Sequence, residues 1–240
     1  MKYQKIIPAI FISRPNRFIA HVYIDGKVET VHVKNTGRCR ELLTEGCTVY
    51  LSVADNPSRK TGYDLVAVEK KRHNKMPLLI NMDSQIANDV AAEWLTSGNL
   101  FSLSASVRRE VTHGNSRFDF YVEDGERKAF VEVKGVTLEH DGVAMFPDAP
   151  TERGVKHVKE LAALIDKGFE AYVLFIVQMK DIRLMRPHDA MHKAFGDALR
   201  EAAQKGVAVL AVDCLVTEDS IVADQQIPVV LEADVNQERN

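Results

Sequence analysis

Apolar and polar side chains alternate in short runs through the first third of the chain, as they do in β-strands that bury one face. The stretch 18–33, "FIAHVYIDGKVETVHV", alternates on both sides of Gly26 and predicts a hairpin. Two more alternating runs, 46–55 and 63–71, are separated by a turn-rich basic loop. About five short strands in so little chain favour a small Greek-key barrel of the OB type.

After residue 80 the patterns of helices and strands alternate, which is typical of an α/β sheet with helices on its faces. The expected helices lie at 83–98, 151–168 and 189–205, and the expected strands at 101–111, 117–123, 128–134, 171–179 and 207–216. Asp83 or Ser84 is expected to cap the first helix, and the acidic stretch after 217 to extend an edge of the sheet. The predicted fold is thus α/β (α+β overall), with an OB-like domain at 1–80 and a second domain at 81–240.

The composition is that of an ordinary globular protein, with 240 residues, 45% hydrophobic and 27% charged. No run approaches the ~18 apolar residues of a membrane span. The apolar run near the start is broken by Pro8 and closed by Arg14, which predicts a first strand rather than a signal peptide. Three cysteines (Cys39, Cys47 and Cys214) favour reduced thiols, and we therefore expect a cytoplasmic protein with no membrane partner.

The formal net charge of -3 conceals two halves of opposite sign. Residues 1–80 contain 14 Lys and Arg against 7 Asp and Glu, whereas residues 81–240 contain 17 against 27. Such asymmetry suggests a polyanion as the partner of the basic half. Two solvated surfaces that differ by accident would give the same count, so charge alone leaves both interpretations open.

The stretch 117–135, "RFDFYVEDGERKAFVEVKG", predicts a hairpin with charged residues in unusual places. A two-residue turn at Asp124-Gly125 would pair Asp119 with Phe130, and a four-residue loop would pair it with Glu132. Either loop places Asp119, Glu132 and Lys134 on one face of the sheet. The apolar layer expected behind them is formed by Phe118, Phe120, Val122, Ala129, Val131 and Val133.

Two carboxylates so close together repel each other, and one lysine offsets only part of that repulsion. A divalent cation, Mg²⁺ or Mn²⁺, is the simplest missing partner, because hard oxygen ligands suit it and it also binds phosphate oxygens. Lys134 could then steady a water or a developing phosphate charge, which indicates metal-assisted phosphodiester hydrolysis. The alternative is a surface ion pair on an ordinary solvated sheet face, since a bare E-x-K pattern is common.

The order of helix, hairpin, helix and buried strand resembles the core of the PD-(D/E)XK nuclease superfamily, αβββαβ. The resemblance implies that Asp119 and Glu132 hold a metal ion and that Lys134 is catalytic. Glu93, on the preceding helix, matches an additional acidic position and would be a third metal ligand. An exposed helix glutamate is the alternative for Glu93.

A closer resemblance, to the sugar fermentation stimulation protein (SfsA) family, rests on four stretches together: "NTGR" with "ELL", "SRFDF", "EVKGVTL" and "FPDAPTERGVKHVKEL". It implies an OB-type domain ahead of a nuclease-like domain, DNA binding, and an association with the regulation of sugar metabolism. Two hypotheses follow: a Mg²⁺-dependent nuclease acting on DNA, expected to be double-stranded, and a non-catalytic DNA-binding regulator of sugar fermentation genes. RNA stays open as a partner, because neither half distinguishes the two nucleic acids.

Further basic and turn residues are candidates for contacts with DNA. Arg153 and His157, four apart on the second helix, share a face and could hold the scissile phosphate. The "NTGR" turn could cradle a phosphate, and the basic run 69–75 could follow the backbone, although an ordinary turn and a solvated linker would look the same. The candidates are Asn35, Thr36, Gly37, Arg38, Lys70, Lys71, Arg72, Arg153 and His157.

Overall fold

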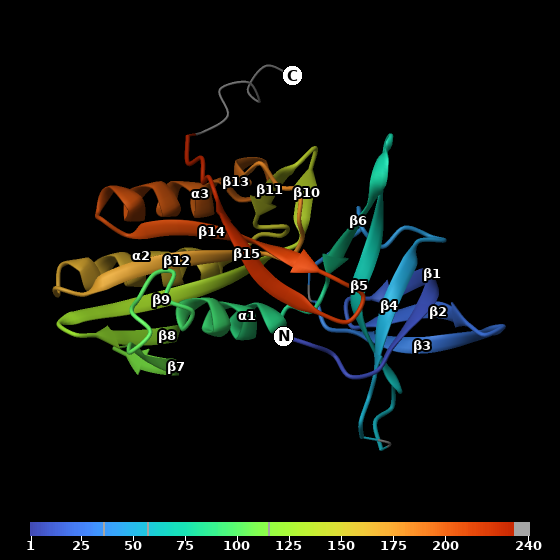
Figure 1. Ribbon diagram of the computed structural model, residues 1–240. Coiled ribbons are helices and arrows are strands. Elements are labelled where there is room, and N and C mark those ends of the chain that lie inside the picture. The colour runs from blue at the N-terminus through green and yellow to red at the C-terminus, as the bar shows by residue number, and fades with distance from the viewer. Residues whose placement is uncertain (36, 57, 115, 233–240) are drawn as a thin grey trace.

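The computed structural model describes residues 1–232 except 36, 57 and 115, and its first half is a β-barrel (Figure 1). Six strands pair in the order β3-β2-β1-β4-β5-β6, and a parallel pairing of His32 with Asp64 joins β3 to β5 and closes the ring. This confirms the OB-type barrel expected from the alternating runs. The strands are β1 Ile6–Asn16, β2 Ile19–Ile24, β3 Lys27–Val33, β4 Thr48–Val53, β5 Tyr63–Arg72 and β6 Lys75–Asn81.

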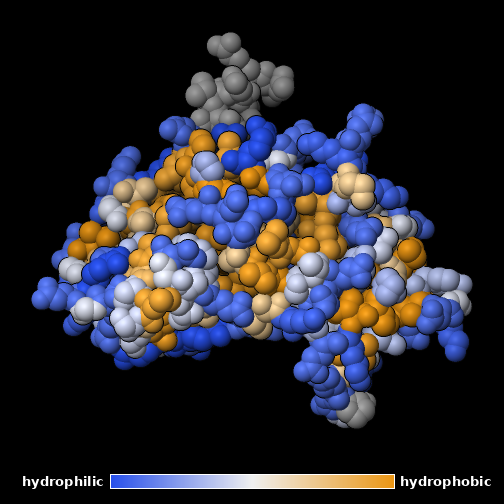
Figure 2. All heavy atoms as spheres, viewed as in Figure 1, coloured by the Kyte–Doolittle hydropathy of each residue, from blue (hydrophilic) through white to orange (hydrophobic). Residues whose placement is uncertain are grey.

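Two basic stretches of the barrel differ in structure. The loop between β4 and β5 projects from the barrel as a hydrophilic arm, at the bottom of Figures 1 and 2. The basic run 69–75, however, is not a linker, because β5 continues to Arg72 and β6 begins at Lys75. Asn74 turns this hairpin with a φ of 52°, a conformation that asparagine tolerates better than most residues.

A second six-stranded sheet, in the order β15-β14-β12-β9-β8-β7, forms the centre of the other half (Figure 1). Helices α2 and α3 pack on one face and α1 on the other, so the central strand β12 is buried on both sides and apolar nearly throughout. The elements are α1 Ile86–Leu95, β7 Ser106–His113, β8 Ser116–Asp124, β9 Arg127–Val136, α2 Glu152–Ile165, β12 Glu170–Val177, α3 Asp189–Gln204, β14 Ala208–Val216 and β15 Ile221–Ile227.

The first predicted helix and the strand after it are shorter than the patterns suggested. Helix α1 begins at Ile86 after Gln85, and neither Asp83 nor Ser84 caps it: Ser84 Oγ donates instead to the carbonyl oxygen of Lys34. Residues 101–105 lie outside β7, because the Asp124 carboxylate accepts hydrogen bonds from the backbone N–H and hydroxyl of Ser102 and fixes a turn there.

A small third sheet, β10 Leu138–His140, β11 Val143–Phe146 and β13 Leu184–Pro187, was not predicted. Its strands have three or four residues, too few for a recognisable alternation. Strand β15, by contrast, pairs with β14 at the edge of the large sheet, as expected for the region after 217.

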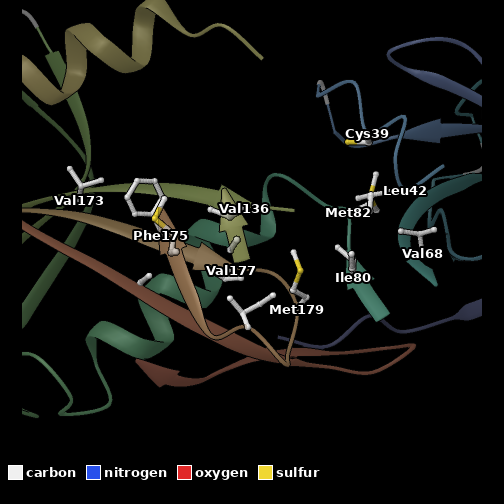
Figure 3. Close-up of a cluster of buried hydrophobic side chains, with 14 of the residues drawn as sticks. Cys39, Leu42, Val68, Ile80, Met82, Val136, Val173, Phe175, Val177 and Met179 are labelled. Carbon is white, nitrogen blue, oxygen red and sulfur yellow. The ribbon is translucent and has the colours of Figure 1, made fainter. Parts of the chain in front are cut away.

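One hydrophobic core continues from the barrel into the second half (Figure 3). Ile80 and Met82 at the end of the barrel lie beside Met179 and Val177 of the second half. The buried Gln178 side chain adds hydrogen bonds across this junction, donating to the carbonyl oxygens of Asn81 and Asp83. Within the described residues, no helix has the length and apolar character needed to cross a membrane.

Candidate functional site

The β8–β9 hairpin has the register of the four-residue loop. Tyr121 pairs with Phe130 and Asp124 with Arg127, and the same register continued places Asp119 opposite Glu132. The strands separate at this point, because the regular ladder ends with the pairing of Phe120 and Val131. The backbone N–H of Val133 donates instead to Oδ2 of Asp119, at 2.7 Å. Asp119 therefore takes the place of a backbone acceptor and opens the end of the hairpin.

This opening corrects one part of the predicted hairpin. Phe120 and Val122 pack with Val131 on the α1 side of the sheet, as the alternation predicted. Phe118 packs on the opposite side, against Phe130, at a distance of 5.2 Å between ring centroids. The strict alternation of faces fails at Asp119, since the strand is irregular where its carboxylate bonds to β9.

A cavity of about 280 Å³ lies at the separated end of the hairpin. Six elements contribute to its lining: strands β7, β8, β9 and β11 and helices α1 and α2. Asp119, Glu132 and Lys134 all line it, so the three residues predicted to carry the chemistry share one cavity. The remaining lining residues are Ser84, Ala87, Asn88, Glu110, Arg117, Val133, Gly135, Phe146, Thr151, Arg153, Gly154 and His157.

Glu132 is the most buried of the three charged groups, with 3% of the residue exposed. Its Oε1 accepts from Lys134 Nζ at 2.5 Å and lies 2.6 Å from Nδ1 of His157. Arg153 Nε donates to Nε2 of His157 at 3.4 Å, which leaves the ring proton on Nδ1, facing Glu132. The other carboxylate oxygen, Oε2, is buried and has no hydrogen-bond partner among the described residues. Such an orphaned acceptor is costly unless something else binds it.

Asp119 is partly buried and lines the same cavity as Glu132. Its Oδ1 accepts from Nδ2 of Asn88 on α1 at 2.9 Å, and its Oδ2 from the Val133 N–H. Burial, followed by the negative charge of Glu132, raises the pKa of Asp119 above its ordinary value. The charge of Glu132 thus disfavours the charged form of Asp119, and a cation between the two carboxylates would offset this repulsion.

The donor set fits a divalent cation that keeps much of its hydration. No group of three or more His, Cys, Asp and Glu in the described part of the chain could hold a metal ion by itself. Two carboxylates are nevertheless sufficient for Mg²⁺, which usually binds one or two of them and completes its coordination with water and phosphate oxygens. The orphaned Oε2 of Glu132 and the Asp119 carboxylate would be the protein ligands.

Glu93, the third metal ligand implied by the nuclease resemblance, does not line the cavity. Its carboxylate instead accepts from the ammonium group of Met1 at 3.0 Å. Asn88 and Glu93 are five residues apart on α1, about 140° around the helix, so only one of them can face Asp119. That residue is Asn88, and the prediction for Glu93 is therefore wrong in this arrangement.

Helix α2 brings its first turn to the cavity. Thr151 caps it, as expected, by accepting from the N–H of Gly154 at 3.1 Å. Arg153 is exposed at the cavity, whereas His157 is buried against Glu132. The positive end of the helix and the Arg153 guanidinium both favour a negatively charged group here. His157 orients Glu132 rather than reaching for a phosphate itself.

The other predicted DNA contacts are divided between two environments. Asn35, Gly37 and Arg38 lie at cavities next to the site described above, while Thr36 is outside the described residues. Lys70 and Arg72 bond instead to the second half: Lys70 Nζ lies 2.5 Å from Glu139 Oε1, and Arg72 binds Asp181 at 3.0 Å. These two ion pairs do not agree with the prediction that both residues contact DNA. Lys71 is exposed.

Two features of the cavity were missed by the sequence reasoning. Asn88 lies in the first turn of α1, and no sequence pattern distinguishes it from an ordinary polar residue at a helix start. Arg117 and Glu110 form an ion pair of 2.8 Å at the rim, and Glu110 has a φ of 56°, which no sequence pattern indicates.

Comparison with known proteins identifies the family. Residues 12–76 match the family described as "SfsA N-terminal OB domain", and residues 85–220 match "Sugar fermentation stimulation protein RE domain". The chain belongs to the sugar fermentation stimulation protein family. Its relatives include a sugar fermentation stimulation protein homolog of Desulfitobacterium hafniense (strain Y51), 58% identical over 96% of this chain and 99% of the relative. Another, from Ruminiclostridium cellulolyticum, is 54% identical over 96% of this chain and all of the relative.

A solved structure of the SfsA family has the same fold along nearly the whole chain. It is described as the structure of Pyrococcus furiosus SfsA in complex with Ca²⁺, and its TM-score to this protein is 0.81. The two chains are 27% identical, over 96% of this chain and 98% of the other. The SfsA family assignment therefore rests on sequence and on structure.

Proposed function

We propose that the protein hydrolyses phosphodiester bonds of nucleic acid, with DNA as its partner, in a reaction that needs a divalent cation. The observation that carries this proposal is the buried, unpartnered Oε2 of Glu132 in a cavity that the Asp119 carboxylate also lines. A site used only to hold phosphate would gain nothing from two additional negative charges. The Pyrococcus furiosus protein was solved as a complex with Ca²⁺, which supports a divalent cation, since Ca²⁺ and Mg²⁺ both prefer hard oxygen ligands.

A bound Mg²⁺ or Mn²⁺ would supply Lewis-acid stabilisation of charge on a phosphate oxygen and a more acidic water. The residues of the chain supply position and charge. His157 and Lys134 fix the Glu132 carboxylate through Oε1 and leave Oε2 without a partner, and Asn88 fixes Asp119. Lys134 Nζ, held 2.5 Å from Glu132, is placed to steady negative charge that develops on the phosphate. Arg153 and the first turn of α2 bind the phosphate from the opposite wall.

Cleavage assays test this proposal directly. Plasmid, single-stranded and double-stranded oligonucleotides and RNA would be incubated with the pure protein in EDTA, Mg²⁺, Mn²⁺ or Ca²⁺. We expect cleavage only with a cation, and a loss of about 100-fold or more in Lys134→Ala, because removal of one preorganised charge-stabilising donor costs that much in other enzymes.

Lys128→Ala, which removes an exposed lysine at the other end of β9, is the matched control and should cleave normally. Equal cleavage by wild type and Lys134→Ala would point to a contaminating nuclease and contradict the proposal. Salt-sensitive binding without cleavage of any substrate in any cation would favour the non-catalytic DNA-binding regulator.

A further inference from the structure

A second cavity, of about 480 Å³, lies on the barrel and is surrounded by arginine side chains. Arg14 and Arg17 come from β1 and the turn after it, and Arg38 and Arg40 from the loop that follows β3. Ala149, from the second half, also lines it. We call the four arginines and their cavity the arginine pocket. Four guanidinium groups around one hollow repel one another unless an anion is bound among them.

Arg14 is the structural member of the arginine pocket. Its guanidinium donates to the backbone carbonyl oxygens of Arg17 and Arg38, both at 2.8 Å, and of Asn35, at 2.7 Å. These bonds hold the two arginine-bearing segments together. Arg17, Arg38 and Arg40 are exposed, and no carboxylate in the described part of the chain forms a salt bridge with them. Their charges are therefore available to a ligand, unlike those of Lys70 and Arg72.

The loop that carries Arg38 is fixed against the second half of the molecule. Asn35 Oδ1 accepts from the Gly37 N–H at 2.7 Å, and a Cβ at Gly37 would lie 2.0 Å from Oδ2 of Asp148. Only glycine allows this close approach. Asp148 lies close to Arg14 and Arg38 and offsets part of the positive charge of the pocket.

A third cavity, of about 160 Å³, shares lining residues with both the arginine pocket and the cavity of the two carboxylates. Gly37 lines both the arginine pocket and this third cavity. Ser84, Gly135 and Phe146 line both the third cavity and the carboxylate site. The three hollows therefore follow one another along the junction of the barrel with the second half, from four arginines to two carboxylates.

We propose that the arginine pocket binds a backbone phosphate of the same nucleic-acid strand whose scissile bond lies at Asp119 and Glu132, and that this strand is unpaired between the two sites. The third cavity is the smallest of the three, and the proposal requires only a sugar–phosphate backbone, not a base pair, to lie there. The inference rests on the proposed function for the identity of the second site. The sequence led us to expect a continuous duplex as the substrate, whereas this inference predicts a strand with an unpaired segment.

Binding measurements test the arginine pocket without depending on hydrolysis. A fluorescently labelled single-stranded oligonucleotide would be titrated in EDTA and in Ca²⁺, with wild type and with Arg38→Gln/Arg40→Gln. We expect affinity to fall about tenfold or more, and the slope of log K against log salt to decrease by about 1.4, for two lost contacts to a single strand. Lys128→Gln/Lys167→Gln removes two exposed charges at the far end of the sheet and serves as the control.

The position of the contact is tested with oligonucleotides that carry one neutral methylphosphonate linkage at successive positions. Wild type should lose affinity when one particular linkage is neutral, and Arg38→Gln/Arg40→Gln should be insensitive to that position. Equal losses in the arginine and control variants would overturn the proposal. So would equally tight, equally arginine-dependent binding of a blunt duplex, or displacement of the strand by inorganic phosphate alone at low millimolar concentration. Normal binding behaviour without cleavage would contradict the proposed function and leave this inference standing.

Discussion

At the scale of single residues, Gly135 shows how closely the carboxylate site is joined to the domain junction. It follows Lys134 directly and lies between Ala87 of α1 and the side chain of Gln178. Gln178 donates to backbone carbonyls of Asn81 and Asp83, at 3.1 and 3.0 Å. The end of β9 therefore fits between α1 and the Gln178 side chain only because residue 135 has no side chain.

Gly135→Ala is expected to destabilise the protein by about 1–3 kcal/mol, the usual cost of overpacking. The added Cβ would lie 2.5 Å from Gln178 Oε1 and 3.2 Å from the Ala87 Cβ, so Gln178 must move and lose its bonds across the junction. Urea unfolding monitored by Trp94 fluorescence measures the loss. Gly62→Ala, where a new Cβ meets nothing within 4 Å, is the control. Unchanged stability of Gly135→Ala would show that Gln178 is not held as described.

The residues of the site were predictable from the sequence where they depend on local pattern. The period of two along the hairpin placed Asp119, Glu132 and Lys134 together, since a strand's faces follow from its alternation. Phe118 and Glu93 were misplaced for non-local reasons. The position of Phe118 depends on the hydrogen bond from the Val133 N–H to Asp119. The position of Glu93 depends on which side of α1 faces the sheet. The spacing of residues along the sequence predicts neither position.

At the scale of elements, strand β10 is fastened to the barrel by Glu139. Burial opposes ionisation of this carboxyl, but the Lys70 ammonium and the Gly142 N–H outweigh that effect and lower the pKa of Glu139 below its ordinary value. A lowered pKa in the folded state means that the unfolded state binds protons first. The contribution to stability is therefore complete above the unfolded pKa and is lost as pH falls through the folded one.

Glu139→Gln is expected to cost about 1–3 kcal/mol at neutral pH, because a buried ammonium loses its charged partner. The free energy of unfolding of the wild type should fall below about pH 4.3, where an ordinary glutamate takes up a proton. That of the variant should depend less on pH in the same range. Thermal unfolding at several pH values gives both results. Asp181→Asn, which weakens the exposed pair with Arg72, should cost less than about 1 kcal/mol. Parallel pH profiles for wild type and Glu139→Gln would contradict this account.

Long periodic elements were predictable, and short ones were not. The helices over 151–168 and 189–205 and the apolar strand over 171–179 were found because each repeats its pattern several times. Strands β10, β11 and β13 are too short to repeat a pattern, and β11 pairs with β13 about 40 residues further along the chain. The basic run 69–75 was interpreted as a DNA contact or a solvated linker, because its charged side chains conceal a hairpin that bonds to the second half.

At the scale of the whole molecule, the sequence pattern separates two domains more sharply than the packing of the structure does. The change from alternating strands to mixed helices and strands near residue 80 predicted two domains, 1–80 and 81–240. In the structure, the barrel shares its core with the second half, and Tyr3 at the start of the chain bonds through its backbone N–H to Asp219. Cys39, Leu42 and Val68 of the barrel belong to the same cluster as Phe175 (Figure 3).

Because of this shared core, we expect the two halves to unfold as one cooperative unit. Met179→Ala removes a fully buried side chain at the junction and should cost about 2–5 kcal/mol. Hydrogen exchange of backbone amides measures the stability of each half separately. The free energy of protection in β1, β4 and β5 should fall by as much as that in β9 and β12, although Met179 belongs to the second half. Met76→Ala, at a side chain with 79% exposure in the barrel, should change neither. If the barrel amides kept their protection in Met179→Ala, the barrel would be stable by itself, and the path between arginines and carboxylates would cross a hinge rather than a fixed junction.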